Sequence, residues 1–282
     1  LFLFVFSVNS QDYYWENPKN ITTSESVFPY TINTNENSYV FWQEIDAKKK
    51  EIYISCRRYK SFQPEVTNNF SLKYEETLRF AGPYSYSGDI PDIFSVTAND
   101  LGDIVLVASD NDNTLDVYTS EDNCKTFSKK KIKSELKMNA PRVYSTYDGK
   151  YRLFASVVQD DSFHIFYSDS VNGKNWNEFT EFLPSQNIPN SFIPYLVKIS
   201  DGDLVVFQGQ YRSEVTHRLS YQLFLTYTTD GGNTWSEAKL LTDQNSFPVK
   251  QKKDFAHFAN QRPFLFNFNN SVYMAWERME NT

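Results

Sequence analysis

One short sequence pattern recurs three times and constrains the fold of this chain more than any other feature. Residues 228–235 read Thr-Thr-Asp-Gly-Gly-Asn-Thr-Trp. Residues 120–127 keep the hydroxyl, the Asp, the Thr and the aromatic residue, and residues 170–176 form a version one residue shorter with Asn in place of Asp. Successive copies start about 50 and about 58 residues apart, a period typical of solenoids, propellers and other repeat arrays.

The chemistry of this repeated pattern is that of a turn. An Asp or Asn side chain binds nearby backbone N–H groups, Gly accepts a positive φ, and the aromatic residue anchors the turn in a core. The residues with these structural roles are Asp122, Phe127, Asn172, Trp176, Asp230, Gly232 and Trp235. An alternating strand precedes each copy and a short polar strand follows it, so we expect each copy to be a hairpin turn.

A pair of apolar strands separated by a polar turn also recurs along the chain. We expect such pairs at residues 28–32 with 39–42, 93–96 with 104–107, 142–144 with 152–155, 193–197 with 204–207, and 263–266 with 272–276. Each of the middle three pairs precedes one copy of the turn. Four strands per unit, repeated, are typical of a propeller blade. The sequence therefore predicts an all-β propeller with about five blades visible, the last of them incomplete.

With its three Asp-containing turns, the chain resembles the Asp-box, or BNR-repeat, proteins, of which the sialidases (neuraminidases) are the best-known family. The resemblance covers most of residues 15–280 and implies a propeller of the six-bladed sialidase type, incomplete in this sequence, over residues 11–282. In that family the boxes lie away from the active face. The resemblance also implies a secreted protein that binds terminal sugars of glycans and, as an exo-α-sialidase, hydrolyses them.

Candidate site residues lie in the loops that we expect on the side opposite the boxes. The candidate sugar-binding residues are Tyr84, Tyr86, Asp110, Asp112, Asp160, Tyr211, Arg212 and Arg262. The two tyrosines belong to an aromatic-rich connection, residues 67–92, which we interpret as an insertion. By resemblance to the sialidases, Asp46 is the nearest match to the catalytic acid, and Glu277 to the glutamate that braces an arginine. Arg212 and Arg262 resemble two of the three arginines that bind the substrate carboxylate.

Two positions depart from the sialidase pattern. Val27 stands two residues before Pro29, where the family has its first arginine, and residues 190–192 (Asn-Ser-Phe) stand where it has the Glu base. The tyrosine nucleophile is not assigned. Three hypotheses stay open: an exo-α-sialidase or related glycosidase, a non-catalytic glycan- or protein-binding propeller with a degenerate site, and a five-bladed glycosidase that works with carboxylates alone. The third requires an Asp/Glu pair about 5–10 Å apart.

Composition argues against several other classes of protein. The net charge of −7 and the lack of a basic stripe argue against nucleic acid as a partner. Three His and two Cys give no metal-binding spacing, and no cofactor is implied. Cys56 and Cys124 lie in neighbouring repeats, and the sequence leaves open whether they pair.

The first ten residues are interpreted as the remnant of a secretory signal peptide, because an apolar run (Leu1 to Val8) is followed by polar residues. An edge strand is the alternative. No stretch reaches the roughly 18 apolar residues of a membrane helix. We therefore expect a secreted or cell-surface protein without a transmembrane span.

Overall fold

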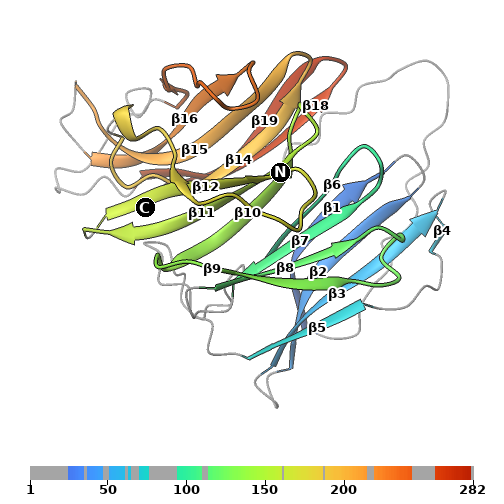
Figure 1. The fold of residues 1–282 in the computed structure, drawn as a ribbon. Coiled ribbons are helices and arrows are strands. Elements are labelled where there is room, and N and C mark those ends of the chain that lie inside the picture. Colours follow the sequence, from blue (N-terminus) through green and yellow to red (C-terminus); the bar gives the residue numbers. More distant parts are fainter. Residues whose placement is uncertain are drawn as a thin grey trace.

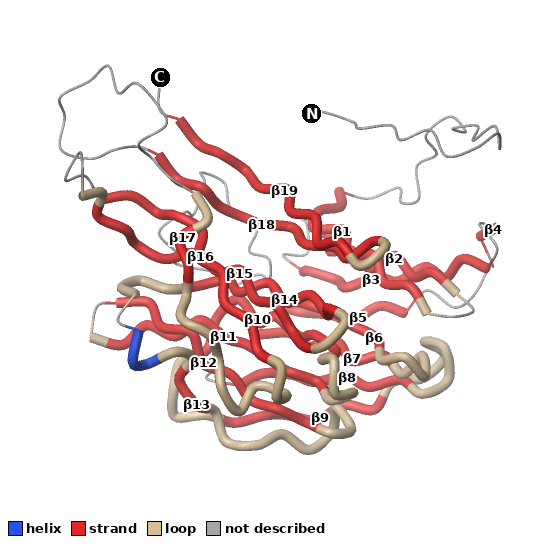
Figure 2. Tube along the Cα trace, turned by 90° about the horizontal axis from the view of Figure 1, so that it is seen from above, coloured by secondary structure: helices blue, strands red, loops and turns tan. Residues whose placement is uncertain are grey.

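The chain is almost entirely β-structure in the part that the computed structural model describes (Figure 1). That part comprises residues 25–34, 37–46, 51–60, 63–64, 70–75, 94–109, 114–160, 162–186, 188–214, 219–242 and 258–280. Its only helical element is a 3-10 turn at Pro184–Gln186, the blue segment of Figure 2. The predicted all-β class is confirmed. No helix in these ranges is long and apolar enough to cross a membrane.

The strands form four sheets arranged like propeller blades (Figure 1). The first sheet contains β1 (Glu25–Asn33), β2 (Ser38–Asp46) and β3 (Glu51–Lys60), with β4 (Gln63–Pro64) and β5 (Phe70–Glu75) both paired to β3. The second contains β6 (Phe94–Ala98), β7 (Ile104–Ser109), β8 (Thr114–Ser120) and β9 (Ser128–Lys133).

The third and fourth sheets repeat the same order. The third contains β10 (Met138–Ser145), β11 (Tyr151–Gln159), β12 (Ser162–Ser170) and β13 (Thr180–Glu181). The fourth contains β14 (Phe192–Ile199), β15 (Gly202–Arg212), β16 (Leu219–Thr228) and β17 (Lys239–Leu240). The first four predicted strand pairs fall within these elements, apart from Ile93, which lies outside the described residues.

The last two strands, β18 (Phe258–Phe268) and β19 (Ser271–Glu280), form a hairpin on the fourth sheet. A single parallel bridge between Tyr221 and Ala259 joins this hairpin to β16. First strands of successive units contact each other in the order β1, β6, β10, β14 and β18, as expected around a propeller. The described residues nevertheless contain four blades. A separate fifth blade and the six-bladed sialidase type are not seen, because β18 bonds to the edge of β16.

Apolar side chains fill the spaces between neighbouring sheets, which explains why the inner strands are apolar on both faces. On β7, Leu106 packs in the cluster shared with the first sheet, and Val105 in the cluster shared with the third. On β11, Leu153 packs in the cluster shared with the second sheet, and Phe154 packs in the cluster shared with the fourth sheet.

The first strands of three blades, and also β18, bend at a proline. The registers of β1, β10, β14 and β18 shift at Pro29, Pro141, Pro194 and Pro263. A bulge suits proline because it has no N–H to donate to the ladder. The residue before the last of these prolines, Arg262, has a positive φ of 47°. The bulge therefore sets the direction of this arginine.

Two details of the sequence interpretation need correction. Residues 67–92 are not wholly an insertion, because Phe70–Glu75 within them is β5, an outer strand paired with β3. The tryptophans of the boxes, Trp176 and Trp235, are half-buried instead of fully buried, since each closes a turn at the edge of the cores. The proposed signal remnant, residues 1–10, lies outside the described residues.

Candidate functional site

The three Asp boxes form the turns that the sequence predicts, between the third and fourth strands of a blade. In the box at 228–235, Asp230 accepts hydrogen bonds from the Thr228 hydroxyl (2.8 Å), the Thr234 amide (3.0 Å) and the Thr234 hydroxyl (2.6 Å). Asp122 makes the same set with Ser120 and Thr126. These hydrogen bonds close each turn on its acidic residue.

The box at 170–176 closes its turn without a charge. The amides of Lys174 and Asn175 both donate to Oδ1 of Asn172 at 2.9 Å. The indole N–H of Trp176 donates to the carbonyl oxygen of Gly173 at 3.0 Å. A neutral amide side chain therefore serves the same structural role.

Acid should weaken the two charged boxes. Burial opposes ionisation of Asp122, but hydrogen bonds from Thr126, Ser120 and Lys125 outweigh it and lower its pKa to about 2. Hydrogen bonds from Thr234 and Thr228 likewise lower the pKa of Asp230 to about 2. A carboxyl group with a lowered folded-state pKa stabilises the fold above its ordinary pKa of 3.8, and this stabilisation is lost as the pH falls toward 2.

We therefore expect the chain to be more stable than its Asp230→Asn variant at about pH 5, and the difference to shrink toward about pH 2.5. Urea denaturation, followed by tryptophan fluorescence at each pH, measures this difference in stability. Asn172→Ala is the matched control, because its stability difference should not change over this range. A difference for Asp230→Asn that is independent of pH would contradict the assignment.

Each box packs against the second strand of the preceding blade. A Cβ atom on Gly173 would lie 2.5 Å from Cγ2 of Val105, and one on Gly232 would lie 2.2 Å from Nη2 of Arg152. Both glycines have a positive φ, 68° and 87°. Close packing and backbone conformation therefore both require glycine there.

Arg152, whose side chain is only 1% exposed, is the largest polar group in these contacts. Its Nε and Nη2 donate to the two oxygens of Asp169, both at 2.7 Å, and Nη2 also donates to the Gly231 carbonyl at 2.9 Å. The guanidinium lies over the rings of Tyr167 and Trp235 at 5.1 and 5.2 Å. Burial opposes its charge, but the hydrogen bonds and charge of Asp169 outweigh burial and raise the pKa of Arg152.

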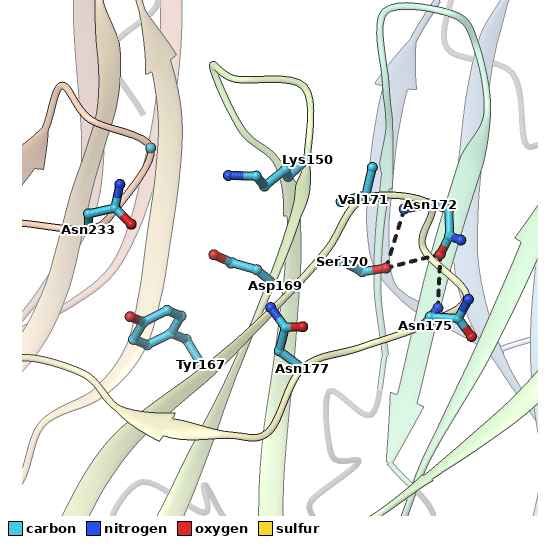
Figure 3. Close-up of a pocket in the computed structure, with 11 residues that line it drawn as sticks. Lys150, Tyr167, Asp169, Ser170, Val171, Asn172, Asn175, Asn177 and Asn233 are labelled. Atoms are coloured by element: carbon cyan, nitrogen blue, oxygen red, sulfur yellow. Dashed lines mark hydrogen bonds between the residues drawn. The ribbon is translucent and has the colours of Figure 1, made fainter.

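An open pocket of about 570 Å³ lies between the boxes of the third and fourth blades (Figure 3). The side chains of Lys150, Tyr167 and Asp169 point toward the loop that carries Asn233. The charged groups of the pocket are engaged within the protein, since Asp169 binds Arg152 and Lys150 binds Asp148 at 2.5 Å. We therefore interpret this pocket as part of the blade contact.

The opposite ends of the strands form the rim where the sequence predicts the site. We define the rim as the start of β14, the end of β15, the start of β16, the start of β18 and the end of β19. Tyr211 and Arg212 are the last residues of β15, and Arg212 is exposed. Asp160 follows β11 and is exposed, with a φ of 49°.

Other predicted site residues are described less fully. Asp46 is the last residue of β2, and its backbone pairs with Glu51, but its side chain is not among the described parts. Tyr84, Tyr86, Asp110 and Asp112 lie outside the described residues. Among the described residues, no group of three or more His, Cys, Asp or Glu side chains could hold a metal ion.

The structure brings Arg262 and Glu277 together on the rim. Nη1 of Arg262 lies 3.4 Å from each oxygen of Glu277, and the two side chains are 49% and 53% exposed. Glu277 pairs in register with Gln261, directly before the bulge that sets the direction of Arg262. The pair is therefore loose and open to solvent, so a ligand can reach both groups.

A buried amide network links β18, the strand that carries Arg262, to β15 and β16. Nε2 of Gln208 donates to the Asn260 carbonyl at 3.1 Å, and Nδ2 of Asn260 donates to Oε1 of Gln222 at 2.8 Å. The Thr242 hydroxyl donates to the same oxygen at 2.7 Å. The indole N–H of Trp276 donates to Oδ1 of Asn260 at 3.0 Å, which fixes the half-exposed ring of the residue that precedes Glu277.

Sequence reasoning missed this network. Its signal was present as polar residues within apolar strands: Gln208 follows Val-Val-Phe, and Gln222 precedes Leu-Phe-Leu. Buried amides are retained where they have hydrogen-bond partners, and here those partners come from four different strands and a loop. The network holds the rim ends of β15, β16 and β18 in one arrangement.

A smaller cavity of about 180 Å³ lies beside the rim, between β12 and the segment before β14. Within it, Nδ1 of His164 lies 2.8 Å from Oε1 of Glu181. Asn190 lines the cavity and donates from Nδ2 to Oε1 of Gln210 at 2.9 Å, and the Gln210 amide N–H₂ contacts the Tyr221 hydroxyl at 3.3 Å. Polar contacts therefore continue along the rim from the third blade to the fourth.

Comparison with known proteins identifies solved structures of similar fold. No family model and no curated protein matches the chain. A solved structure of a protein of unknown function from Dyadobacter fermentans superposes with a TM-score of 0.52 at 13% identity, over 89% of this chain and 74% of that chain. A GH43 β-1,3-galactosidase superposes with a TM-score of 0.50 at 13% identity, over 88% of this chain and 55% of the galactosidase chain.

The fold is a β-propeller like those of these two structures. At this identity the likeness concerns the fold alone. This likeness does not distinguish the sialidases from other propeller proteins.

Proposed function

We propose that this chain is a glycan-binding propeller whose site is the rim around Arg212, Arg262 and Glu277. The observation that carries the proposal is the exposed Arg262–Glu277 pair together with a buried, mutually hydrogen-bonded amide network. Charged side chains on strands that a hydrogen-bond network holds together are positioned before a ligand binds. This reduces the entropy lost on binding.

The chemistry of this rim suits an acidic sugar such as sialic acid. A guanidinium group binds a carboxylate through two parallel hydrogen bonds. The described contact of Arg262 with Glu277 uses Nη1 alone, and the Arg262 side chain is half-exposed. Arg212, at the end of β15 in the same sheet, carries a second guanidinium. The half-exposed Trp276 ring supplies an aromatic face of the kind that sugars stack on.

Binding is proposed ahead of hydrolysis. A sialidase-type reaction would use Asp46 as the acid, with Glu277 bracing an arginine. The positions of the first arginine and of the base hold Val27 and residues 190–192 instead. The chain is therefore proposed to be a secreted sialidase-like propeller with a degenerate site that hydrolyses sialosides weakly or not at all.

Ligand binding tests the proposal directly. Isothermal titration of the full chain with sialyllactose should show saturable binding, and lactose, which lacks the carboxylate, should not bind. Arg262→Ala should weaken sialyllactose binding about 10- to 100-fold, as expected for the loss of a charge-assisted hydrogen bond. Lys174→Ala, on the box face, is the matched control and should bind like the unchanged chain.

Equal affinity for sialyllactose and lactose would overturn the assignment of the arginines. A fluorogenic sialoside tests hydrolysis separately. Rapid turnover that persists in Asp46→Ala would contradict the assignment of Asp46 as the acid.

A further inference from the structure

The box at 120–127 has a cysteine where the other two boxes have a glycine. Cys124 occupies the place that Gly232 holds in the box at 228–235, since each backbone amide donates to the first hydroxyl of its box, at 3.0 Å to Ser120 and 2.9 Å to Thr228. Cys124 has a φ of 61°, in the left-handed region that favours glycine. A cysteine there is held in a disfavoured conformation.

The side chain of Cys124 points into the contact between the first and second blades. At the equivalent positions of the other boxes, a Cβ would collide with Val105 or Arg152 on the second strand of the preceding blade. Here the preceding blade presents Tyr39, whose hydroxyl instead donates to Oδ1 of Asn123 at 3.0 Å. The box of the second blade therefore has room for a cysteine side chain at a position where the other two boxes have room only for glycine.

The partner of Cys124 is Cys56, on β3 of the first blade. Both residues are buried, with exposed fractions of 8% and 3%, and both belong to the apolar cluster between these blades. The two thiols are joined by a hydrogen bond and both are free. Two sulfur atoms on different blades therefore meet in one dry core.

We propose that Cys56 and Cys124 form a disulfide bond that joins the first and second blades under oxidising conditions. A metal site does not fit these residues, because no third metal-binding side chain accompanies them among the described residues. A disulfide does fit them, since it needs only two sulfur atoms, and these two lie in one apolar cluster within hydrogen-bonding reach of each other.

The oxidant in this proposal is a small-molecule disulfide such as oxidised glutathione. The thiolate of one cysteine attacks this disulfide, forming a mixed disulfide and releasing one glutathione thiolate. The thiolate of the second cysteine attacks the protein-bound sulfur, forming the Cys56–Cys124 bond and releasing a second glutathione. Two cysteine thiols are oxidised, one glutathione disulfide is reduced, and the two protons pass to the released glutathione thiols.

The exchange should occur while the two blades are still apart. In the folded chain the hydrogen bond to Cys56 and burial raise the pKa of Cys124, which disfavours the attacking thiolate. The closed core also excludes an oxidant of this size. Oxidation of the folded chain should therefore be slow, and oxidation during refolding fast.

Refolding of the full chain in a buffer of reduced and oxidised glutathione, compared with refolding in dithiothreitol, tests the proposal. Both thiols should become unreactive to alkylation in denaturant, the intact mass should fall by about 2 Da, and a non-reducing digest should link the peptides that carry the two cysteines. The oxidised chain should melt roughly 10 °C above the reduced chain.

Two variants keep the test decisive. Cys56→Ser should leave one reactive thiol and a melting temperature that does not respond to oxidant. Cys124→Gly restores the glycine of the box, so it should fold under both conditions and also lose the response. Two reactive thiols in correctly folded chain after refolding with oxidised glutathione, or linkage only between different chains, would overturn the proposal.

Discussion

Replacing Arg152 with Ala should lower the free energy of unfolding by about 3–5 kcal/mol. The change removes a fully buried guanidinium and leaves the Asp169 carboxylate, whose side chain is only 19% exposed, without its two hydrogen bonds. It also leaves the rings of Tyr167 and Trp235 without the group that lies between the third and fourth blades. Denaturant unfolding followed by circular dichroism measures the loss.

Two other variants show how large a change in the free energy of unfolding to expect from weaker contacts. Lys150→Ala removes a half-exposed charge that pairs with Asp148 on the same face, and it should change the free energy of unfolding by less than about 1 kcal/mol. Arg152→Lys keeps the charge but loses the forked geometry, so its effect should lie between the other two. A loss below about 1 kcal/mol for Arg152→Ala would show that Arg152 does not hold the blades together.

Gly202→Ala should destabilise the fold by roughly 3 kcal/mol, near the upper end of the effects of overpacking. A Cβ on Gly202 would lie 1.9 Å from the backbone carbonyl oxygen of Thr228, the residue that begins the last box. Backbone atoms cannot rotate away as a side chain can, so the turn between β14 and β15 or the box itself must move. Thermal and denaturant melts of the full chain measure the effect.

Gly149→Ala is the matched control, because Gly149 lies in the equivalent turn between β10 and β11. Its φ is 80°, but a Cβ there would meet nothing within 4 Å. Only the conformational preference of the backbone is lost, which costs about 1 kcal/mol. Equal losses for the two variants would show that the contact with Thr228 is not responsible.

The Asp boxes were predictable because their chemistry is local. Asp122, Asn172 and Asp230 each bind groups that lie within four residues in the chain, so the sequence pattern specifies the turn by itself. The strand pairs were predictable for a similar reason, since apolar residues buried on both faces of an inner strand produce an apolar run. The half-burial of Trp176 and Trp235 was not predictable, because it depends on what packs beside each turn.

The candidate site was only partly predictable. Loop position indicated Arg212, Arg262 and Glu277, but their relation depends on the pairing of β18 with β19 and on the bulge at Pro263. The amide network that supports them joins Gln208, Gln222 and Asn260, which are distant in the chain. No local pattern links such residues, because their contacts arise only when β18 joins the fourth blade.

The sequence by itself determined the all-β class, the strand order and the position of the turns, since residue preference and hydrogen bonding within a few residues decide these. The tertiary structure decided which residues meet between blades: Arg152 with the last box, Cys56 with Cys124, and β18 with the edge of β16. These contacts depend on how blades pack and how strand edges pair. Packing and edge pairing join residues far apart in the chain, and so no short stretch of sequence encodes them.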